Sequence, residues 1–152
     1  MNCSKEKNNR ILIVDDEVDV LEFLRIYLET MGWEVSVASS VTEAFEELEK
    51  LPYFLVITDI AMPEMDGYEF ISAIKAKGCE CRFALMTGFG YNPKHTLVKI
   101  YKTVKYPCLF KPFNREKVVE AVKEAHELYH NAIDGDSTAK ADGSDANGDS
   151  VD

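Results

Sequence analysis

The hydrophobic positions of the chain form short apolar runs that alternate with longer segments in which apolar and polar residues recur at helical spacing. The short runs predict β-strands at residues 11–14, 33–38, 54–58, 82–87 and 108–110. The longer segments predict helices at residues 17–31, 40–51, 67–77, 93–102 and 114–130. Strands that alternate with helices, and that are apolar along nearly their whole length, are typical of a parallel sheet with helices on both faces.

Local signals mark several helix ends. Ser40 and Glu43 match a capping box, so a helix begins there and ends before Pro52. Gly32 stands where a glycine C-cap belongs, and Asn114 is placed to cap the last helix. Because crossovers between parallel strands are right-handed, few topologies remain for five such units. We therefore expect a flavodoxin-like, doubly wound five-stranded sheet with strand order 2-1-3-4-5.

Composition divides the 152-residue chain into an N-terminal extension at 1–9, a single folded domain at 10–131 and an acidic tail at 132–152 that we expect to be disordered. The net charge is −10, which argues against direct binding to nucleic acid because that needs a basic face. No apolar run approaches the ~18–20 residues of a membrane span, and the N-terminus has no signal-peptide core. We expect a cytoplasmic protein with no membrane contact, whose four cysteines are reduced.

Polar residues stand at the carboxyl ends of four of the five predicted strands. Asp15 and Asp16 follow the first strand, Asp59 follows the third, Thr87 ends the fourth and Lys111 follows the fifth. Open α/β sheets bind ligands at this edge, where the strand order reverses. We therefore expect three carboxylates, a hydroxyl and an ammonium to converge there.

This set of residues suits phosphoryl transfer. Clustered carboxylates repel one another, and Mg²⁺ relieves the repulsion while keeping positions for waters and phosphate oxygens. Lys111 suits a phosphoryl oxygen as a point charge, and Thr87 can donate a hydrogen bond to another. Asp59 stands alone at its strand end before a loop that contains Pro63 and turns at Asp66-Gly67, so it is the candidate nucleophile for an acyl phosphate.

The same residues carry a resemblance to the response-regulator receiver domain of two-component signalling. It covers residues 10–129 and rests on "ILIVDDE" with Asp15 and Asp16, "DIAMPEMDG" with Asp59, "MTG" with Thr87 and "KPF" with Lys111. The resemblance implies phosphotransfer to Asp59 from a sensor histidine kinase or a phosphotransfer protein. It also implies Mg²⁺ bound by Asp16, Asp59 and the main-chain carbonyl of Ala61, with Asp15 contributing through water.

The resemblance further implies a signalling phosphoacceptor that catalyses its own Mg²⁺-dependent phosphorylation and slow autodephosphorylation, and is not a conventional enzyme. An unknown output protein would dock on the face made by the fourth helix, the fifth strand and the fifth helix. One position departs from the family pattern. Receivers usually have Tyr or Phe three residues before the lysine, where this chain has Cys108.

Three other functions were weighed. A binding module of the same fold that has lost phosphorylation would not need all the site residues, which are present here. A flavin-binding electron carrier needs a phosphate loop after the first strand, where Asp15, Asp16 and Glu17 would repel the phosphate. An aspartyl phosphatase usually has a second acid two residues after its nucleophile, where this chain has Ala61. We expect His95, His126 and His130 to be solvated or partly packed on helix surfaces, without matching partners.

Overall fold

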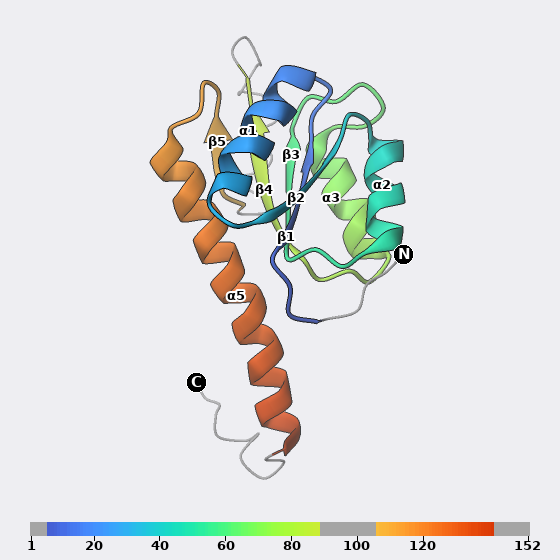
Figure 1. Cartoon of the computed structure of the whole chain (residues 1–152). Coiled ribbons are helices and arrows are strands. Elements are labelled where there is room, and N and C mark those ends of the chain that lie inside the picture. The colour runs from blue at the N-terminus through green and yellow to red at the C-terminus, as the bar shows by residue number, and fades with distance from the viewer. Residues whose placement is uncertain (1–5, 89–105, 142–152) are drawn as a thin grey trace.

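The computed structural model describes residues 6–88 and 106–141, and its elements alternate along the chain as the hydrophobic pattern predicts (Figure 1). The strands are β1 (Arg10–Val14), β2 (Glu34–Ala38), β3 (Leu55–Asp59), β4 (Arg82–Thr87) and β5 (Cys108–Phe110). The helices are α1 (Val18–Thr30), α2 (Val41–Lys50), α3 (Gly67–Ala76) and α5 (Arg115–Ala141). The helix expected at 93–102 lies outside the described residues.

The five strands form one parallel sheet in the order β2-β1-β3-β4-β5, which confirms the predicted topology. The chain crosses from β2 to β3 over β1, so β1 and β3 lie side by side at the point where the strand order reverses. In a doubly wound sheet this is where a ligand-binding crevice opens, at the carboxyl ends of the strands.

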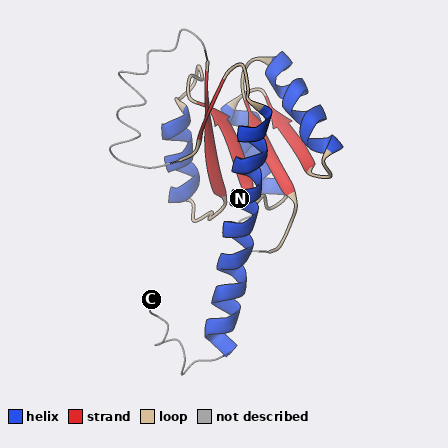
Figure 2. Ribbon diagram, turned by 90° about the vertical axis from the view of Figure 1, so that its left-hand side faces the viewer, coloured by secondary structure: helices blue, strands red, loops and turns tan. Residues whose placement is uncertain are grey.

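Helices α1 and α5 cover one face of the sheet, and α2 and α3 cover the other (Figures 1 and 2). Alternate residues of a strand point to opposite faces, so Ile11 and Ile13 pack with α1 and α5 while Leu12 and Val14 pack with α2 and α3. The strands of the sheet centre are therefore buried on both sides, which explains their nearly continuous apolar sequence.

The helix starts agree with the predicted ones, with one difference in how they are capped. The Ser40 hydroxyl accepts a hydrogen bond from the Glu43 N–H at 3.1 Å, as a capping box requires. The Glu43 carboxylate, however, accepts from the N–H of Ser39 at 2.8 Å and not from Ser40. A complete capping box occurs at the start of α3 instead, between Asp66 and Glu69.

Helix α5 is longer than the sequence predicts. It was expected to end at about residue 130, but it continues to Ala141 and projects beyond the sheet (Figure 1). Two contacts support the added turns: Ile133 packs against the apolar core beneath α5, and Asp134 pairs with Lys7 at 2.8 Å. The segment predicted to be disordered from residue 132 therefore begins as helix, and residues 142–152 lie outside the described part.

The expectation that all four cysteines are reduced is wrong for Cys79, which is disulfide-bonded. That expectation rested on chain size and compartment, and neither indicates which sulfur atoms a fold brings together. Cys81 and Cys108 are free, and burial raises the pKa of their thiols to about 12 and about 11. Within the described residues, no helix is both long enough and apolar enough to span a bilayer.

Candidate functional site

The polar residues at the strand ends meet at one edge of the sheet, because all the strands are parallel and in register. Val14 of β1 lies opposite Thr58 of β3, so Asp15 and Asp59 follow as neighbours. Thr87 of β4 lies opposite Phe110 of β5, and the backbone N–H of Lys111 donates to the Thr87 carbonyl at 2.9 Å. The predicted convergence of these strand ends is therefore present in the fold.

Lys111 is the centre of the site. Its Nζ lies 2.7 Å from Oδ2 of Asp15, 2.9 Å from Oε1 of Glu17 and 3.3 Å from Oδ2 of Asp59. Its side chain is only 13% exposed, so its pairs with the buried Asp15 and Asp59 are poorly screened by solvent, whereas Glu17 is 62% exposed. Burial by itself lowers the pKa of Lys111, but the hydrogen bonds to Asp15 and Glu17 outweigh it, so the pKa is raised and the amine stays protonated.

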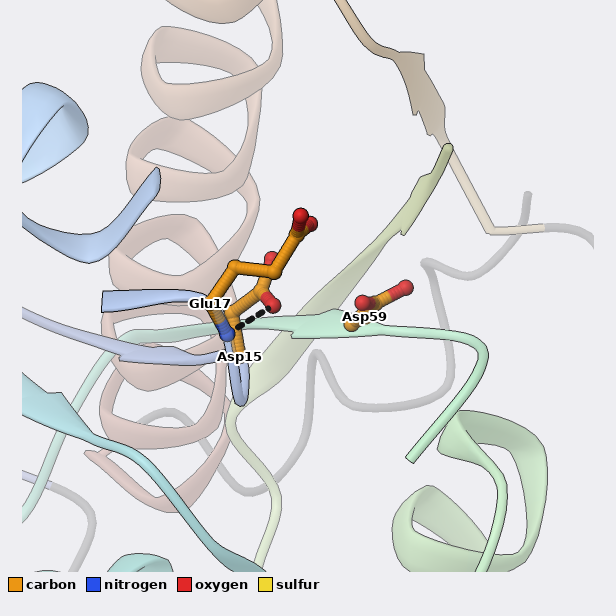
Figure 3. Close-up of side chains that lie close together, drawn as sticks. All are labelled: Asp15, Glu17 and Asp59. Carbon is orange, nitrogen blue, oxygen red and sulfur yellow. Dashed lines mark hydrogen bonds between the residues drawn. The ribbon is translucent and has the colours of Figure 1, made fainter. Parts of the chain in front are cut away.

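Asp15 is the most buried of the carboxylates, with no exposed surface. Its Oδ1 accepts the backbone N–H of Glu17 at 2.9 Å, as the dashed line in Figure 3 marks, and its Oδ2 accepts from Lys111. Burial raises the pKa of Asp15 to about 6, and the nearby charge of Asp59 acts in the same direction. The two hydrogen bonds oppose that rise but do not cancel it, so the charged form of Asp15 is held at a cost in free energy.

Asp59 is 5% exposed and is held from both sides. Its Oδ1 accepts the backbone N–H of Ala61 at 3.2 Å, and its Oδ2 faces Lys111. The loop after it returns to the strand end, where the N–H of Gly67 donates to the carbonyl of Ile60 at 2.8 Å. A Cβ at Gly67 would stand 2.5 Å from the main-chain oxygen of Asp59, so only glycine allows this approach. The loop thus fixes the backbone that carries the candidate nucleophile.

The carboxylates that lie together are Asp15, Glu17 and Asp59, with one oxygen of each within 4.8 Å of the others (Figure 3). Sequence reasoning missed Glu17, although it directly follows the Asp15-Asp16 pair and its acidic side chain was a visible signal. Asp16, which was expected to bind the metal, is exposed and is not part of this group. The roles expected of Asp16, of the Ala61 carbonyl and of the Thr87 hydroxyl stay predictions.

The three clustered carboxylates fit a hard divalent cation. Mg²⁺ prefers carboxylate oxygens and completes its octahedron with waters or phosphate oxygens. In this group Asp15 is buried and costly to ionise, and Asp59 is the candidate nucleophile. A cation bound between them would stabilise the ionised form of both.

Two of the histidines lie elsewhere and are partly packed, as expected, but they also make hydrogen bonds that the sequence did not predict. The rings of His126 and His130 lie on α5 with their centroids 4.0 Å apart and their planes tilted by 41°, and both residues contact the segment before β1. Their partners come from the other end of the chain, which no local pattern indicates. His95 lies outside the described residues.

The position expected to hold an aromatic ring is occupied by Cys108, which is half-buried beside β4. Tyr106 packs edge-on against Phe83 at 5.8 Å on the same side of the sheet, whereas Phe110 is 56% exposed. Of the two rings that flank Cys108, only Tyr106 is therefore packed into the core.

Comparisons with known proteins agree with this geometry. A family model described as the response regulator receiver domain matches residues 11–123. The response regulator receiver protein CpdR of Brucella abortus is 31% identical over 118 residues, which cover 76% of this chain and 94% of CpdR. The transcriptional regulatory protein ZraR of Escherichia coli (strain K12) is 30% identical over 132 residues, which cover 87% of this chain but 29% of ZraR.

Solved structures show the same likeness. A crystal structure of a response regulator receiver domain protein from Clostridium thermocellum is similar with a TM-score of 0.71 and 26% identity, covering 81% of this chain and 98% of that chain. The chain therefore spans nearly the whole of single-domain relatives and under a third of the larger regulator ZraR.

Proposed function

Since this chain belongs to the response regulator receiver family of two-component signalling, we propose that it accepts a phosphoryl group on Asp59 in a Mg²⁺-dependent reaction and thereby changes its binding to an output partner. The family is a signalling family and not one of conventional enzymes. The observation that carries the proposal is the position of Asp59: nearly buried, oriented by the Ala61 N–H, and faced by the ammonium of Lys111.

The transfer step would use the side chains that meet at the strand ends. A carboxylate oxygen of Asp59 forms a bond to phosphorus while the bond from phosphorus to a histidine nitrogen of the donor breaks, and that nitrogen keeps the electron pair. Asp59 then carries an acyl phosphate. Bound Mg²⁺ would supply positive charge for the developing charge on the phosphoryl oxygens, with Asp15, Glu17 and Asp59 as the nearby carboxylates.

Lys111 would also contact the phosphoryl group once Asp59 is phosphorylated. In the unphosphorylated site its shorter bonds are to Asp15 and Glu17, and its longest is to Asp59. A phosphoryl group on Asp59 presents three oxygens with more negative charge than a carboxylate. We infer that Lys111 moves toward these oxygens, and that Thr87 at the end of the neighbouring strand donates to another.

For the phosphodonor and the output partner we propose the kind of protein and the surface that it would bind. A sensor histidine kinase or a phosphotransfer protein would supply the phosphoryl group. The output protein would dock on the face that includes β5 and α5, where Phe110 and Leu128 are 56% and 41% exposed. The cytoplasm is the compartment we propose for these encounters.

The test is chemical labelling with acetyl phosphate and Mg²⁺, followed by mass mapping of the acyl phosphate. Asp59→Asn should lose the label while its circular dichroism stays that of the wild type. Asp19→Asn, on the exposed side of α1, is the matched control and should keep it. Undiminished labelling of Asp59→Asn would refute the assignment, and an unlabelled wild type would favour a binding module that has lost phosphorylation.

A further inference from the structure

The segment before β1 lies along α5 and forms a second feature, away from the phosphoacceptor site. Residues 6–9, here called the N-terminal strap, contact α5 at four points. The backbone N–H of Asn8 donates to Nε2 of His130 at 3.1 Å, and the hydroxyl of Tyr129 donates to the carbonyl of Glu6 at 3.1 Å. His126 Nε2 lies 2.9 Å from Oδ1 of Asn9, and Lys7 pairs with Asp134.

Asn8 connects the strap to the sheet. Its side chain is only 8% exposed, and its Oδ1 accepts the N–H groups of Arg10 at the start of β1 and of Phe54 just before β3. Its Nδ2 donates to the Glu6 carbonyl at 3.0 Å. The strap thus ties the amino ends of β1 and β3 to the far part of α5, at the edge of the sheet opposite the carboxylate site.

The hydrogen bonds of His130 fix its protonation state. A backbone N–H can only donate, so Nε2 of His130 must accept from Asn8 and carries no proton. Nδ1 lies 2.8 Å from the carbonyl of His126, which can only accept, so Nδ1 carries the proton. His130 is therefore the neutral Nδ1–H tautomer, and protonation at Nε2 would set two N–H groups against each other.

We propose that His130 is a pH-sensitive clasp: the neutral ring accepts the Asn8 N–H and helps to hold the N-terminal strap on α5, and protonation of Nε2 breaks that bond and loosens the strap. The bond to Asn8 is the one contact of the four that a proton on a histidine must abolish. The bond from His126 to Asn9 tolerates a protonated ring, because the Asn9 side-chain oxygen can accept from either form.

The surroundings of His126 oppose positive charge on its ring. Burial, and next the neighbouring His130, lower the pKa of His126, while Glu127 acts in the opposite direction. The Phe54 ring meets His126 edge-on at 5.0 Å, and Trp33 lies 5.1 Å from it. Charged and titratable groups on the packed elements include Glu6, Lys7, Arg10, Glu34, Cys81, Glu127, Tyr129 and Asp134. Of these, Lys7 is paired with Asp134, and Arg10 lies 3.9 Å from Glu34.

The sequence of the pair also matches a metal pattern, which the contacts do not support. Residues 126–130 read His-Glu-Leu-Tyr-His, the H-E-x-x-H spacing of zinc peptidases. Both ring nitrogens of His130 are already hydrogen-bonded. Over residues 6–88 and 106–135, the group of three ligating side chains that lies close enough for a metal is Asp15, Glu17 and Asp59, far from this pair in the fold. The two histidines at this spacing therefore bind the N-terminal strap, through Asn8 and Asn9.

The wild-type chain, labelled with ¹⁵N, tests the clasp by NMR. At pH 7.5 long-range imidazole spectra should show His130 protonated at Nδ1 and unprotonated at Nε2. Between pH 7.5 and pH 5.5 the amide signals of residues 6–9 should shift with the same midpoint as the His130 ring. The protection of the Asn8 amide against exchange should fall by about fivefold, the factor that one hydrogen bond of ordinary strength supplies.

Two variants separate His130 from its neighbour. His130→Gln places a carbonyl oxygen near the position of Nε2 and does not titrate, so the strap should stay bound at pH 5.5. His126→Gln keeps His130 and should keep the acid release. An Nε2–H tautomer of His130 at pH 7.5, strap signals that do not change down to pH 5.5, or an acid transition in His130→Gln equal to that of the wild type would each overturn the proposal. The wild-type spectra decide it even if the glutamine does not reach Asn8.

Discussion

Replacing Asp15 with asparagine should make the metal-free protein more stable, although Asp15 belongs to the candidate site. The side chain is fully buried, and its pKa is raised from 3.8 to about 6 by burial first and by Asp59 after that. Asparagine has nearly the same shape, keeps an oxygen to accept the Glu17 N–H, and carries no charge. The variant removes the costly ionised state and keeps the hydrogen bond from the Glu17 N–H, but its Nδ2 replaces the oxygen that accepts from Lys111.

The size of the gain follows from the pKa. A carboxyl group whose folded pKa lies about two above its unfolded value costs about 3 kcal/mol of stability at neutral pH, where it is ionised in both states. Lys111 loses a charged partner in the variant, although Glu17 and Asp59 remain beside it. We therefore expect a gain of about 1–3 kcal/mol in the free energy of unfolding at pH 7.5.

The direction of the pKa shift also predicts how the stability gain of Asp15→Asn changes with pH. Because the folded pKa is the higher one, the contribution of Asp15 to stability is fully present below pH 3.8 and is lost as the pH rises through about 6. The advantage of the variant should therefore be largest above pH 7 and fall to about a third of that value near pH 4.5. Urea unfolding followed by circular dichroism, in EDTA at pH 7.5 and pH 4.5, measures both.

Asp19→Asn is the control, since Asp19 is exposed on α1 and should change stability little at either pH. Adding Mg²⁺ should then stabilise the wild type more than Asp15→Asn, because ligand binding to the folded state adds to its stability. A variant less stable than the wild type in EDTA at pH 7.5, or an equal gain at both pH values, would refute the reasoning.

Two further predictions concern residues beside the nucleophile. Glu17→Gln should change the free energy of unfolding by no more than about 0.5 kcal/mol, because the Glu17 side chain is 62% exposed. Calorimetric titration should nevertheless show that Mg²⁺ binds the variant roughly several-fold more weakly than the wild type. An unchanged Mg²⁺ affinity would show that Glu17 is not part of the cation site. Gly67→Ala should lower the free energy of unfolding by about 1–3 kcal/mol through the clash with the Asp59 main-chain oxygen. The exposed Ser72→Ala on the same helix is its control, and equal urea midpoints for the two would contradict the clash.

The sheet and most of the site could be predicted from sequence because the signals are local. Each strand is a short apolar run, and the residue that follows it lies at the ligand-binding edge whatever the details of packing. The convergence of Asp15, Asp59 and Lys111 was predicted in this way, and Thr87 lies at its strand end as expected, although the role of its hydroxyl stays a prediction. Ser40 was also placed correctly as a cap, because an N-cap depends on only three or four consecutive residues.

The features that were missed depend on contacts between distant parts of the chain. The Asn8–His130 bond joins residues 122 positions apart, and nothing near His130 in sequence predicts it. The added turns of α5 depend in part on Lys7, at the other end of the chain. Glu17 is a different case, since it is local but exposed at the start of α1, and only the position of Lys111 brings its carboxylate into the site.

The charges of the site explain why Glu17 matters. Three carboxylates and one ammonium leave two net negative charges at the strand ends when all four groups are ionised. A divalent cation would balance that charge, and the site as it stands is left with the burial cost that raises the pKa of Asp15. A phosphoryl group on Asp59 would add further negative charge at the most distant of the three carboxylates that Lys111 now contacts. We therefore propose that Lys111 follows that charge when another cation takes its place beside Asp15 and Glu17, so that Mg²⁺ would already act in the unphosphorylated site and not only in the transfer step.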